Sequence, residues 1–156
     1  MEVVAVDIGG THARFAIAEV GGGKVQSLGE PVTLKTADHG SLQLAWQAFG
    51  RRIDRELPRA ASIAVASPIN DTLIKLTNNP WIIRPPLMHE RLGVDTYSFI
   101  NDFGAVGHAV AQVPDDNFIH VCGPDVPLPD RGVISVCGPG TGLGSRRCCA
   151  MPTTIT

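Results

Sequence analysis

Four short segments carry residue types that could handle phosphate groups, sugar hydroxyls and protons. In the first, residues 7–11, Asp7 ends an apolar run, and two glycines and Thr11 follow it. Glycines let the backbone approach an anion closely and point N–H groups at it. The Asp7 carboxylate could hold Mg²⁺ through water, because a hard cation prefers oxygen ligands. The alternative is a plain Gly-Gly hairpin turn beside a solvated aspartate.

A second glycine-rich segment, residues 138–144, has four glycines in seven residues and follows another apolar run. Such a segment is typical of a phosphate cradle. Neither glycine segment has the spacing of a Walker loop or of a dinucleotide-binding fingerprint. A glycine-rich turn without a ligand is the alternative here.

The pair Asn101-Asp102 closes an apolar stretch and opens a helical one. A carboxylate at the start of a helix accepts hydrogen bonds from the first backbone N–H groups. A carboxylate in that place could also orient a substrate hydroxyl and accept its proton during phosphoryl transfer. The alternative is an ordinary helix cap.

The fourth segment, residues 77–81, contains two asparagines and Trp81. Asparagine amides both donate and accept, which suits a sugar with many hydroxyls. Trp81 could pack on a sugar face or in the core, and the core is the commoner place for a single tryptophan. None of the four cysteines forms a C-x-x-C pair, so we expect Cys122 and Cys137 to be buried strand residues in a reducing cytosol.

Composition excludes several classes of protein. The 156 residues are 44% hydrophobic and 18% charged, with a formal net charge of −2, which indicates a globular chain and not a disordered one. That net charge does not indicate the excess of Lys and Arg that is typical of nucleic-acid-binding proteins. No apolar run approaches the ~18 residues of a membrane span, and the first residues lack the pattern of a signal peptide. We therefore expect a cytoplasmic protein that binds neither nucleic acid nor membrane.

The elements that must position these segments alternate between strands and helices. Apolar residues at helical spacing predict a helix over 41–52 with Ser41 as its cap, a short helix over 87–92 and a further helix whose apolar stripe is Ala105, Val106, Ala109 and Val110. Strands are predicted over 3–8, 13–20, 25–36, 60–66, 72–76, 97–100, 118–122 and 132–137. This order is typical of an α/β domain that opens with a meander of hairpins.

The pattern of the amino-acid sequence changes after Gly144. Residues 145–156 show no periodicity. The strand over 132–137 should lead to a further element, because an unpaired strand exposes its backbone edge, and the sequence predicts none. The chain therefore has the features of an unfinished product.

Taken in order, the four segments closely resemble the bacterial glucokinase family, which belongs to the actin-like ATPase and sugar kinase superfamily. The resemblance rests on residues 7–16, 76–81, 100–103 and 140–144, and it covers residues 1 to about 144. The ordered set is specific, whereas any one of the segments alone is not.

The resemblance implies a fold of two ribonuclease H-like α/β domains around a cleft. Residues 1–111 would form the small domain, residues 112–144 the first strands of an incomplete large domain, and residues 145–156 a tail outside the family. We expect such a tail from a frameshifted or truncated gene product. The resemblance also implies a homodimer for a full-length member of the family.

The activity that the resemblance implies is transfer of the γ-phosphoryl group of Mg-ATP to the 6-hydroxyl of glucose, in glycolysis. Asp102 would be the general base, and Asn101 would bind a sugar hydroxyl beside it. Thr77 and Asn78 would line the same cleft. The ATP phosphates would lie against Asp7, Ile8, Gly9, Gly10, Thr11, Gly138, Gly140, Thr141 and Gly142, with Mg²⁺ held by Asp7 through water.

Two alternatives stay open. A non-catalytic, sugar-responsive regulator could use the same fold, but regulators of that kind usually carry an N-terminal DNA-binding helix, and this chain begins at its first strand. A kinase of another hexose is the other alternative, because the asparagines favour a hexose without selecting glucose. As a truncated chain the protein is expected to be inactive alone, since phosphoryl transfer depends on both walls of the cleft.

Overall fold

The computed structural model describes residues 1–76, 78–127, 132–139 and 143–150. The chain divides into two compact units, Met1–Asp102 and Phe103–Thr156. The division falls after Asp102, whereas the family resemblance puts the domain boundary after residue 111. Each unit is considered by itself below.

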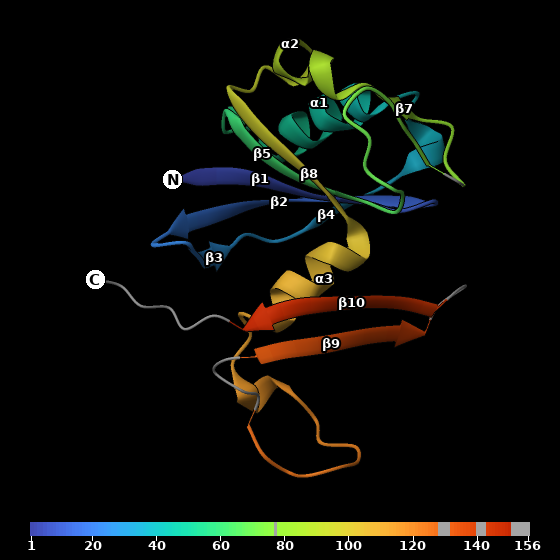
Figure 1. Ribbon diagram of the computed structural model, residues 1–156. Helices are drawn as coiled ribbons and strands as arrows, with labels where there is room; N and C mark the ends of the chain where they lie inside the picture. Colours follow the sequence, from blue (N-terminus) through green and yellow to red (C-terminus); the bar gives the residue numbers. More distant parts are fainter. Residues whose placement is uncertain (77, 128–131, 140–142, 151–156) are drawn as a thin grey trace. The chain divides into compact units, whose positions relative to one another are not determined.

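Unit 1 is built on a six-stranded mixed sheet with the order β3-β2-β1-β5-β8, in which β4 also pairs with β2 (Figure 1). Its strands are β1 (Glu2–Ile8), β2 (His12–Gly21), β3 (Lys24–Leu28), β4 (Val32–Lys35), β5 (Ala60–Val65) and β8 (Thr96–Asn101). The first four are joined by antiparallel pairing, which confirms the opening meander. The pairs β1–β5 and β5–β8 are parallel, so these three strands end at the same edge.

Two helices of unit 1 lie on one side of this sheet, α1 (Leu42–Ile53) and α2 (Met88–Leu92). Ser41 caps α1 by accepting a hydrogen bond from the Leu44 N–H at 3.3 Å, as predicted. A 3-10 turn, η2 (Pro85–Leu87), leads into α2, and η1 (Thr36–Asp38) follows β4. A small antiparallel pair, β6 (Ile74–Lys75) with β7 (Ile82–Ile83), completes this layer.

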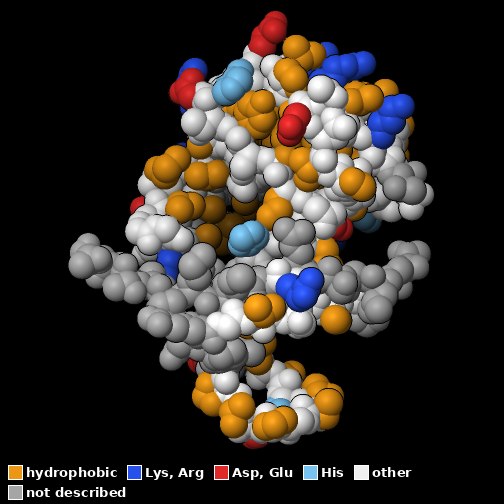
Figure 2. Space-filling view, in the orientation of Figure 1, with side chains coloured by type: hydrophobic (Ala, Val, Ile, Leu, Met, Phe, Trp, Pro, Cys, Tyr) orange, Lys and Arg blue, Asp and Glu red, His pale blue; other side chains and the backbone are white. Residues whose placement is uncertain are grey.

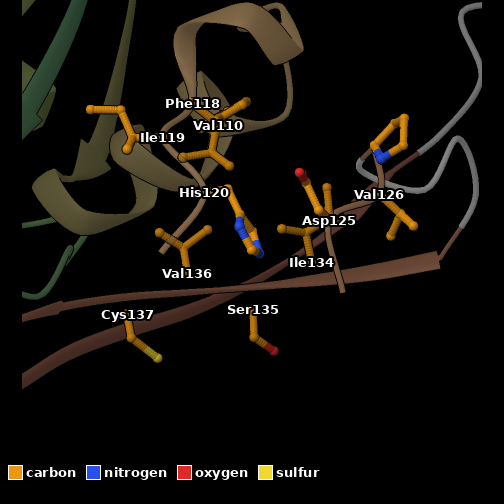
Figure 3. A pocket seen from close by; sticks show the side chains of 11 residues that line it. Val110, Phe118, Ile119, His120, Asp125, Val126, Ile134, Ser135, Val136 and Cys137 are labelled. Atoms are coloured by element: carbon orange, nitrogen blue, oxygen red, sulfur yellow. The ribbon is translucent and has the colours of Figure 1, made fainter. Parts of the chain in front are cut away.

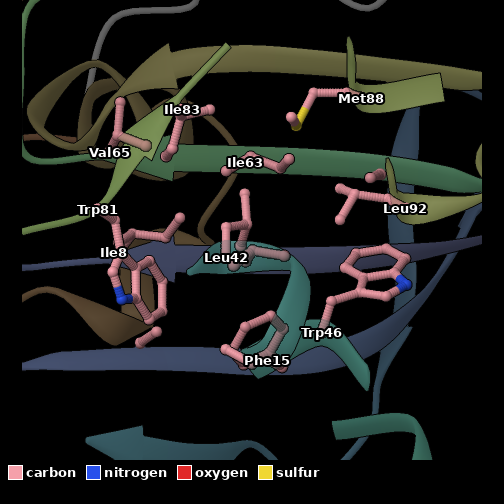
Figure 4. Close-up of a cluster of buried hydrophobic side chains, with 14 of the residues drawn as sticks. Ile8, Phe15, Leu42, Trp46, Ile63, Val65, Trp81, Ile83, Met88 and Leu92 are labelled. Atoms are coloured by element: carbon pink, nitrogen blue, oxygen red, sulfur yellow. The ribbon is translucent and has the colours of Figure 1, made fainter. Parts of the chain in front are cut away.

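The core of unit 1 fills the space between the sheet and these helices (Figure 4). Alternate residues of β1 are buried while the others are partly exposed, the period expected when one face is covered. The predicted stripe of α1 is buried at Leu42, Ala45, Trp46 and Phe49. Phe49 stacks on Phe15 of β2 with ring centroids 5.4 Å apart, which joins the helix to the sheet.

Unit 2 contains most of α3 (Asp102–Val110), the 3-10 turn η3 (Asp115–Asn117) and the antiparallel strands β9 (Gly132–Pro139) and β10 (Leu143–Ala150). The buried positions of α3 are Gly104 and Gly107, whereas Val106 of the predicted apolar stripe is 44% exposed. None of the helices in the described ranges is long and apolar enough to cross a membrane.

Two strand predictions were wrong in detail. The stretch over 25–36 is two strands, β3 and β4, because the interval between them contains Gly29 and Pro31, and proline cannot donate to a strand ladder. The stretch 118–122 is not a strand, and Ile119 is 88% exposed. β-branched residues favour a strand only where a neighbouring strand can pair with it, and the described chain offers this segment no such partner.

The cysteine prediction and the end of the chain also need correction. Cys122 and Cys137 are both exposed, not buried, because the first lies in the irregular segment and the second on a two-stranded ladder. A further element does follow residue 137: β10 pairs with β9 over its whole length, with Ser145 opposite Cys137. Backbone pairing does not depend on side-chain periodicity, so the sequence pattern missed it. Residues 151–156 lie outside the described part.

Candidate functional site

Three strands bring two of the predicted segments to one edge of the unit 1 sheet. Ile8 of β1 lies opposite Val65 of β5, and Val65 lies opposite Asn101 of β8. The Ala66 N–H, just beyond β5, donates to the Ile8 carbonyl at 3.0 Å. In open α/β sheets, ligands bind outside the carboxyl ends of parallel strands. Residues 9–11 and Asp102 leave the sheet at this edge.

The connection from β1 to β2 is a three-residue turn, Gly9, Gly10 and Thr11. Neither glycine has a positive φ, so this is not the two-residue type I′ hairpin of the simple alternative. The turn is held through its carbonyl groups: Asn79 Nδ2 donates to Gly9 at 3.2 Å, Thr36 Oγ1 to Gly10 at 2.9 Å and the Thr36 N–H to Thr11 at 3.0 Å. Within the described part, the N–H groups of Gly10 and Thr11 have no acceptor.

The segment predicted to bind sugar lies directly against this turn. A Cβ on Gly10 would come within 3.0 Å of the Asn78 Cβ, and the Asn78 side chain is exposed. Trp81 is only 1% exposed, and its Nε1 donates to the His39 carbonyl at 2.7 Å. Trp81 is therefore a core residue and not a platform for a sugar face. Thr77 lies outside the described residues.

Asp7 lies at the end of β1, opposite Arg14 of β2. The two side chains form an ion pair with 2.9 Å between Arg14 Nη1 and Asp7 Oδ2, and both are about half exposed. Among the described residues no group of three or more His, Cys, Asp or Glu side chains could hold a metal ion. A cation at Asp7 would therefore take most of its ligands from water or from a bound phosphate.

Asn101 and Asp102 fall where β8 passes into α3, as predicted. Asn101 Nδ2 donates to the Ser67 carbonyl at 3.3 Å. Ser67 is buried, and its hydroxyl donates to the Lys75 carbonyl at 2.7 Å. Sequence reasoning missed Ser67, although a serine directly after an apolar strand is a signal for a polar group at the carboxyl edge.

The second glycine segment belongs to unit 2. Gly138 lies in β9, and a Cβ there would meet Phe103 Cε2 at 2.5 Å, so any other residue at this position would have to displace the ring. Gly140, Thr141 and Gly142 lie outside the described residues.

Unit 2 also has a hollow of about 580 Å³, lined mainly by apolar side chains (Figure 3). Ile134 and Val136 of β9 lie on its side of the strand, while Ser135 and Cys137 point away. Apolar side chains gather on the neighbouring segment 118–127, where Ile119, Val121 and Val126 are at least 70% exposed (Figure 2). None of the predicted site residues that the structure describes lines this hollow.

The unit 1 sheet also carries an exposed ion pair. Arg59 and Asp95 form a two-pronged ion pair at the amino ends of β5 and β8, the edge opposite the site. The hydrogen bonds from Arg59 lower the pKa of Asp95.

The fold of the chain is similar to that of sugar kinases with the actin-like ATPase fold. The crystal structure of a glucokinase from an Antarctic psychrotroph matches 96% of this chain and 47% of that one, with a TM-score of 0.83 and 27% identity. A glucokinase of the ROK family from Streptomyces griseus, in complex with glucose and AMPPNP, covers 99% of this chain and 46% of its own, with a TM-score of 0.60. At 16% identity that likeness shows the fold alone.

The family follows from sequence comparison. The family model described as Glucokinase matches residues 4–154, so the chain belongs to the glucokinase family. It is 60% identical over 144 residues to the glucokinase of Zymomonas mobilis subsp. mobilis, which covers 92% of this chain and 44% of that protein. It is 40% identical over 114 residues to the glucokinase of Rhizobium etli, covering 71% of this chain and 32% of that protein. The chain thus spans less than half the length of these relatives.

The family match bears on the tail. It continues to residue 154, beyond the limit of about 144 that the resemblance suggested. The assignment of residues 145–156 to a tail outside the family stays a prediction.

Proposed function

We propose that unit 1 forms the sugar-binding and proton-accepting side of an ATP-dependent glucose kinase. The observation that supports this most directly is the carboxyl edge of β1, β5 and β8, where the glycine turn leaves β1 and Asn101-Asp102 leaves β8, the two parallel strands on either side of β5. Membership of the glucokinase family supports glucose as the acceptor.

In this proposal Asp102 is the general base. Its carboxylate accepts the proton of the glucose 6-hydroxyl while that oxygen forms its bond to the γ-phosphorus and the bond from the γ-phosphorus to the bridging oxygen of ADP breaks. Asn101, Asn78 and Thr77 orient the sugar hydroxyls. The Ser67 carbonyl fixes the Asn101 amide group, which leaves less side-chain freedom to lose when glucose binds.

The phosphates of ATP are assigned to the two glycine segments. The phosphate-binding residues of unit 1 are Asp7, Ile8, Gly9, Gly10 and Thr11. Those of unit 2 are Gly138, Gly140, Thr141 and Gly142. The carbonyl groups of residues 9–11 accept hydrogen bonds from Asn79 and Thr36. This supports the role, because the N–H groups of Gly10 and Thr11 are then available to bind an anion.

Mg²⁺ fits at Asp7. The exposed carboxylate uses Oδ2 for Arg14, which leaves Oδ1 to bind the ion through water. Bound there, Mg²⁺ would neutralise charge on the phosphates.

Other parts of the proposal come from the family alone. A homodimer of a full-length protein and a place in the cytoplasm and in glycolysis stay predictions. Kinases of other hexoses share the fold, and selection between epimers needs a hydrogen bond to each distinguishing hydroxyl.

Glucose binding to this chain tests the proposal at its first step. Titration followed by tryptophan fluorescence and by calorimetry should show saturable binding of glucose and weaker binding of mannose and galactose. Asn101→Ala should weaken binding, whereas Asn70→Ala, in the exposed loop after β5, should not. Absence of glucose binding would contradict the proposal. Tighter binding of another hexose would make that hexose, and not glucose, the proposed substrate. A regulator would bind the sugar and leave ATP intact.

A further inference from the structure

The turn assigned to phosphate is held by two buried polar side chains from distant parts of the chain. Thr36 follows β4 and is 3% exposed, and Asn79 precedes Trp81 and is 7% exposed. Each donates to a different carbonyl of the turn, Thr36 to Gly10 and Asn79 to Gly9. The two side chains therefore hold adjacent peptide groups.

These bonds form part of a closed ring. Asn79 Oδ1 accepts from the Trp81 N–H at 2.9 Å, and Trp81 Nε1 donates to the His39 carbonyl at 2.7 Å. The His39 N–H donates to the Thr36 carbonyl at 3.2 Å. The Thr36 hydroxyl, which donates to the Gly10 carbonyl of the turn, closes the ring. A fully satisfied polar network of this kind fixes one arrangement, because each buried group that lost its partner would carry a desolvation cost.

The ring joins the phosphate turn to the sugar segment. Asn79 is the neighbour of Asn78, whose Cβ lies against Gly10. A displacement of the turn must therefore move the sugar segment, and the reverse also holds.

We propose that Thr36 and Asn79 are positioning residues: Thr36 holds the turn for the nucleotide phosphates, and Asn79 ties that turn to the sugar-binding segment so that both keep one geometry. This inference rests on the proposed function, since it concerns the same site. Neither residue needs to touch a substrate to act in this way.

The chain offers substitutions that remove single donors. Thr36→Val deletes the hydroxyl and keeps the backbone bond to Thr11, and Thr36→Ser restores the hydroxyl. Asn79→Asp keeps the acceptor for Trp81 and replaces the donor to Gly9 by a carboxylate oxygen, which repels that carbonyl and adds a buried charge. Asn70→Asp is the matched control, because Asn70 also serves as an acceptor, for the Thr72 N–H at 2.9 Å, but lies in an exposed loop.

The experiment measures binding of glucose and of AMPPNP with Mg²⁺ to the whole chain by calorimetry. Thr36→Val should weaken AMPPNP binding about fivefold, the factor of one net hydrogen bond, and weaken glucose binding by a smaller factor, because Asn79 still ties the turn to the sugar segment. Asn79→Asp should weaken both by at least about fivefold, because it loses one hydrogen bond and sets a buried carboxylate against the Gly9 carbonyl. Thr36→Ser and Asn70→Asp should bind both ligands as the unmodified chain does.

Hydrogen exchange of the ligand-free chain provides a second, independent measurement. The Gly9 amide donates to His12 and the Thr36 amide to Thr11, so their exchange reports opening of the turn. In Thr36→Val and Asn79→Asp these amides should exchange faster by a larger factor than the Val6 amide of β1. A purely stabilising role would accelerate all three equally.

The outcomes separate the two proposals. Equal acceleration of turn and strand amides, or a defect in Thr36→Ser as large as in Thr36→Val, would overturn the positioning role. Failure of the unmodified chain to bind either ligand would contradict the proposed function, and the exchange ratios would then decide the positioning of the turn alone. If one variant fails to fold, the other still tests its own bond.

Discussion

Replacement of Gly10 by alanine should be more costly than the same change at its neighbour Gly9. A Cβ at Gly10 would lie 3.0 Å from the Asn78 Cβ and 3.4 Å from the Asn78 carbonyl oxygen, whereas one at Gly9 would meet only the His12 carbonyl oxygen, at 3.5 Å. Neither glycine has a positive φ, so backbone strain does not distinguish the two positions. Gly9→Ala is therefore a matched control one residue away.

The magnitude follows from these contacts. Carbon atoms pack best at about 3.5–4.0 Å, so the new methyl group must displace Asn78 by about 0.5–1 Å. Overpacking costs about 1–3 kcal/mol, and the exposure of Asn78 places the cost near the lower end. Both substitutions gain about 0.4–1 kcal/mol from the less flexible unfolded chain. We expect Gly9→Ala to be neutral or slightly stabilising and Gly10→Ala to be about 1–2 kcal/mol less stable than Gly9→Ala.

Urea unfolding followed by tryptophan fluorescence measures this difference, because both tryptophans, Trp46 and Trp81, belong to unit 1. With a slope of about 1–3 kcal/mol per molar urea, the midpoints should differ by roughly 0.3–2 M. Gly10→Ala should also weaken glucose binding through the displaced Asn78. Equal midpoints for the two variants would refute the close packing of Gly10 against Asn78.

Three further outcomes follow from unit 1. Phe49→Ala should lower the free energy of unfolding by about 3–5 kcal/mol, measured in the same urea experiment, because the side chain is 1% exposed; a loss below about 1 kcal/mol would contradict its burial. Ser41→Ala should cost about 0.5–1 kcal/mol by removing the acceptor of the Leu44 N–H at the start of α1. Since Arg59 lowers the pKa of Asp95, their pair stabilises the fold above the ordinary value of 3.8 and loses that contribution as the pH falls through the lowered value. Unfolding midpoints of the unmodified chain and of Asp95→Asn should therefore converge in acid, and a constant difference would contradict the pair.

Local signals in the sequence predicted most of unit 1. Helix α1 carries its cap at Ser41 and a full apolar stripe, so its face and its start were both correct. Strand β1 was predicted from its β-branched, apolar run, which ends at Gly9-Gly10. The short pair β6–β7 was harder, because two residues per strand give no period.

Unit 2 shows where local signals fail. The apolar run 118–122 has strand composition but no partner among the described residues, whereas β10 has no apolar period and pairs along its whole length with β9. Strand formation depends on what lies alongside, and that contact is not local.

The same distinction holds for the candidate site. Asp7, Asn101 and Asp102 were found because each ends a strand or starts a helix. Arg14 and Thr36 were missed, because their contacts to Asp7 and to Gly10 depend on strand register and on the path of the chain after β4.

The most direct test of the account uses a full-length relative. The glucokinase of Zymomonas mobilis, with its matched segment replaced by the corresponding residues of this chain, should phosphorylate glucose in an assay coupled to ADP formation. In that chimera Asp102→Asn should lower kcat by about 10²–10⁴-fold and leave glucose binding intact, while Asp95→Asn, at the opposite edge of the sheet, should leave kcat unchanged. An Asp102→Asn chimera that turns over as fast as the unmodified one would contradict the assignment of Asp102 as the general base.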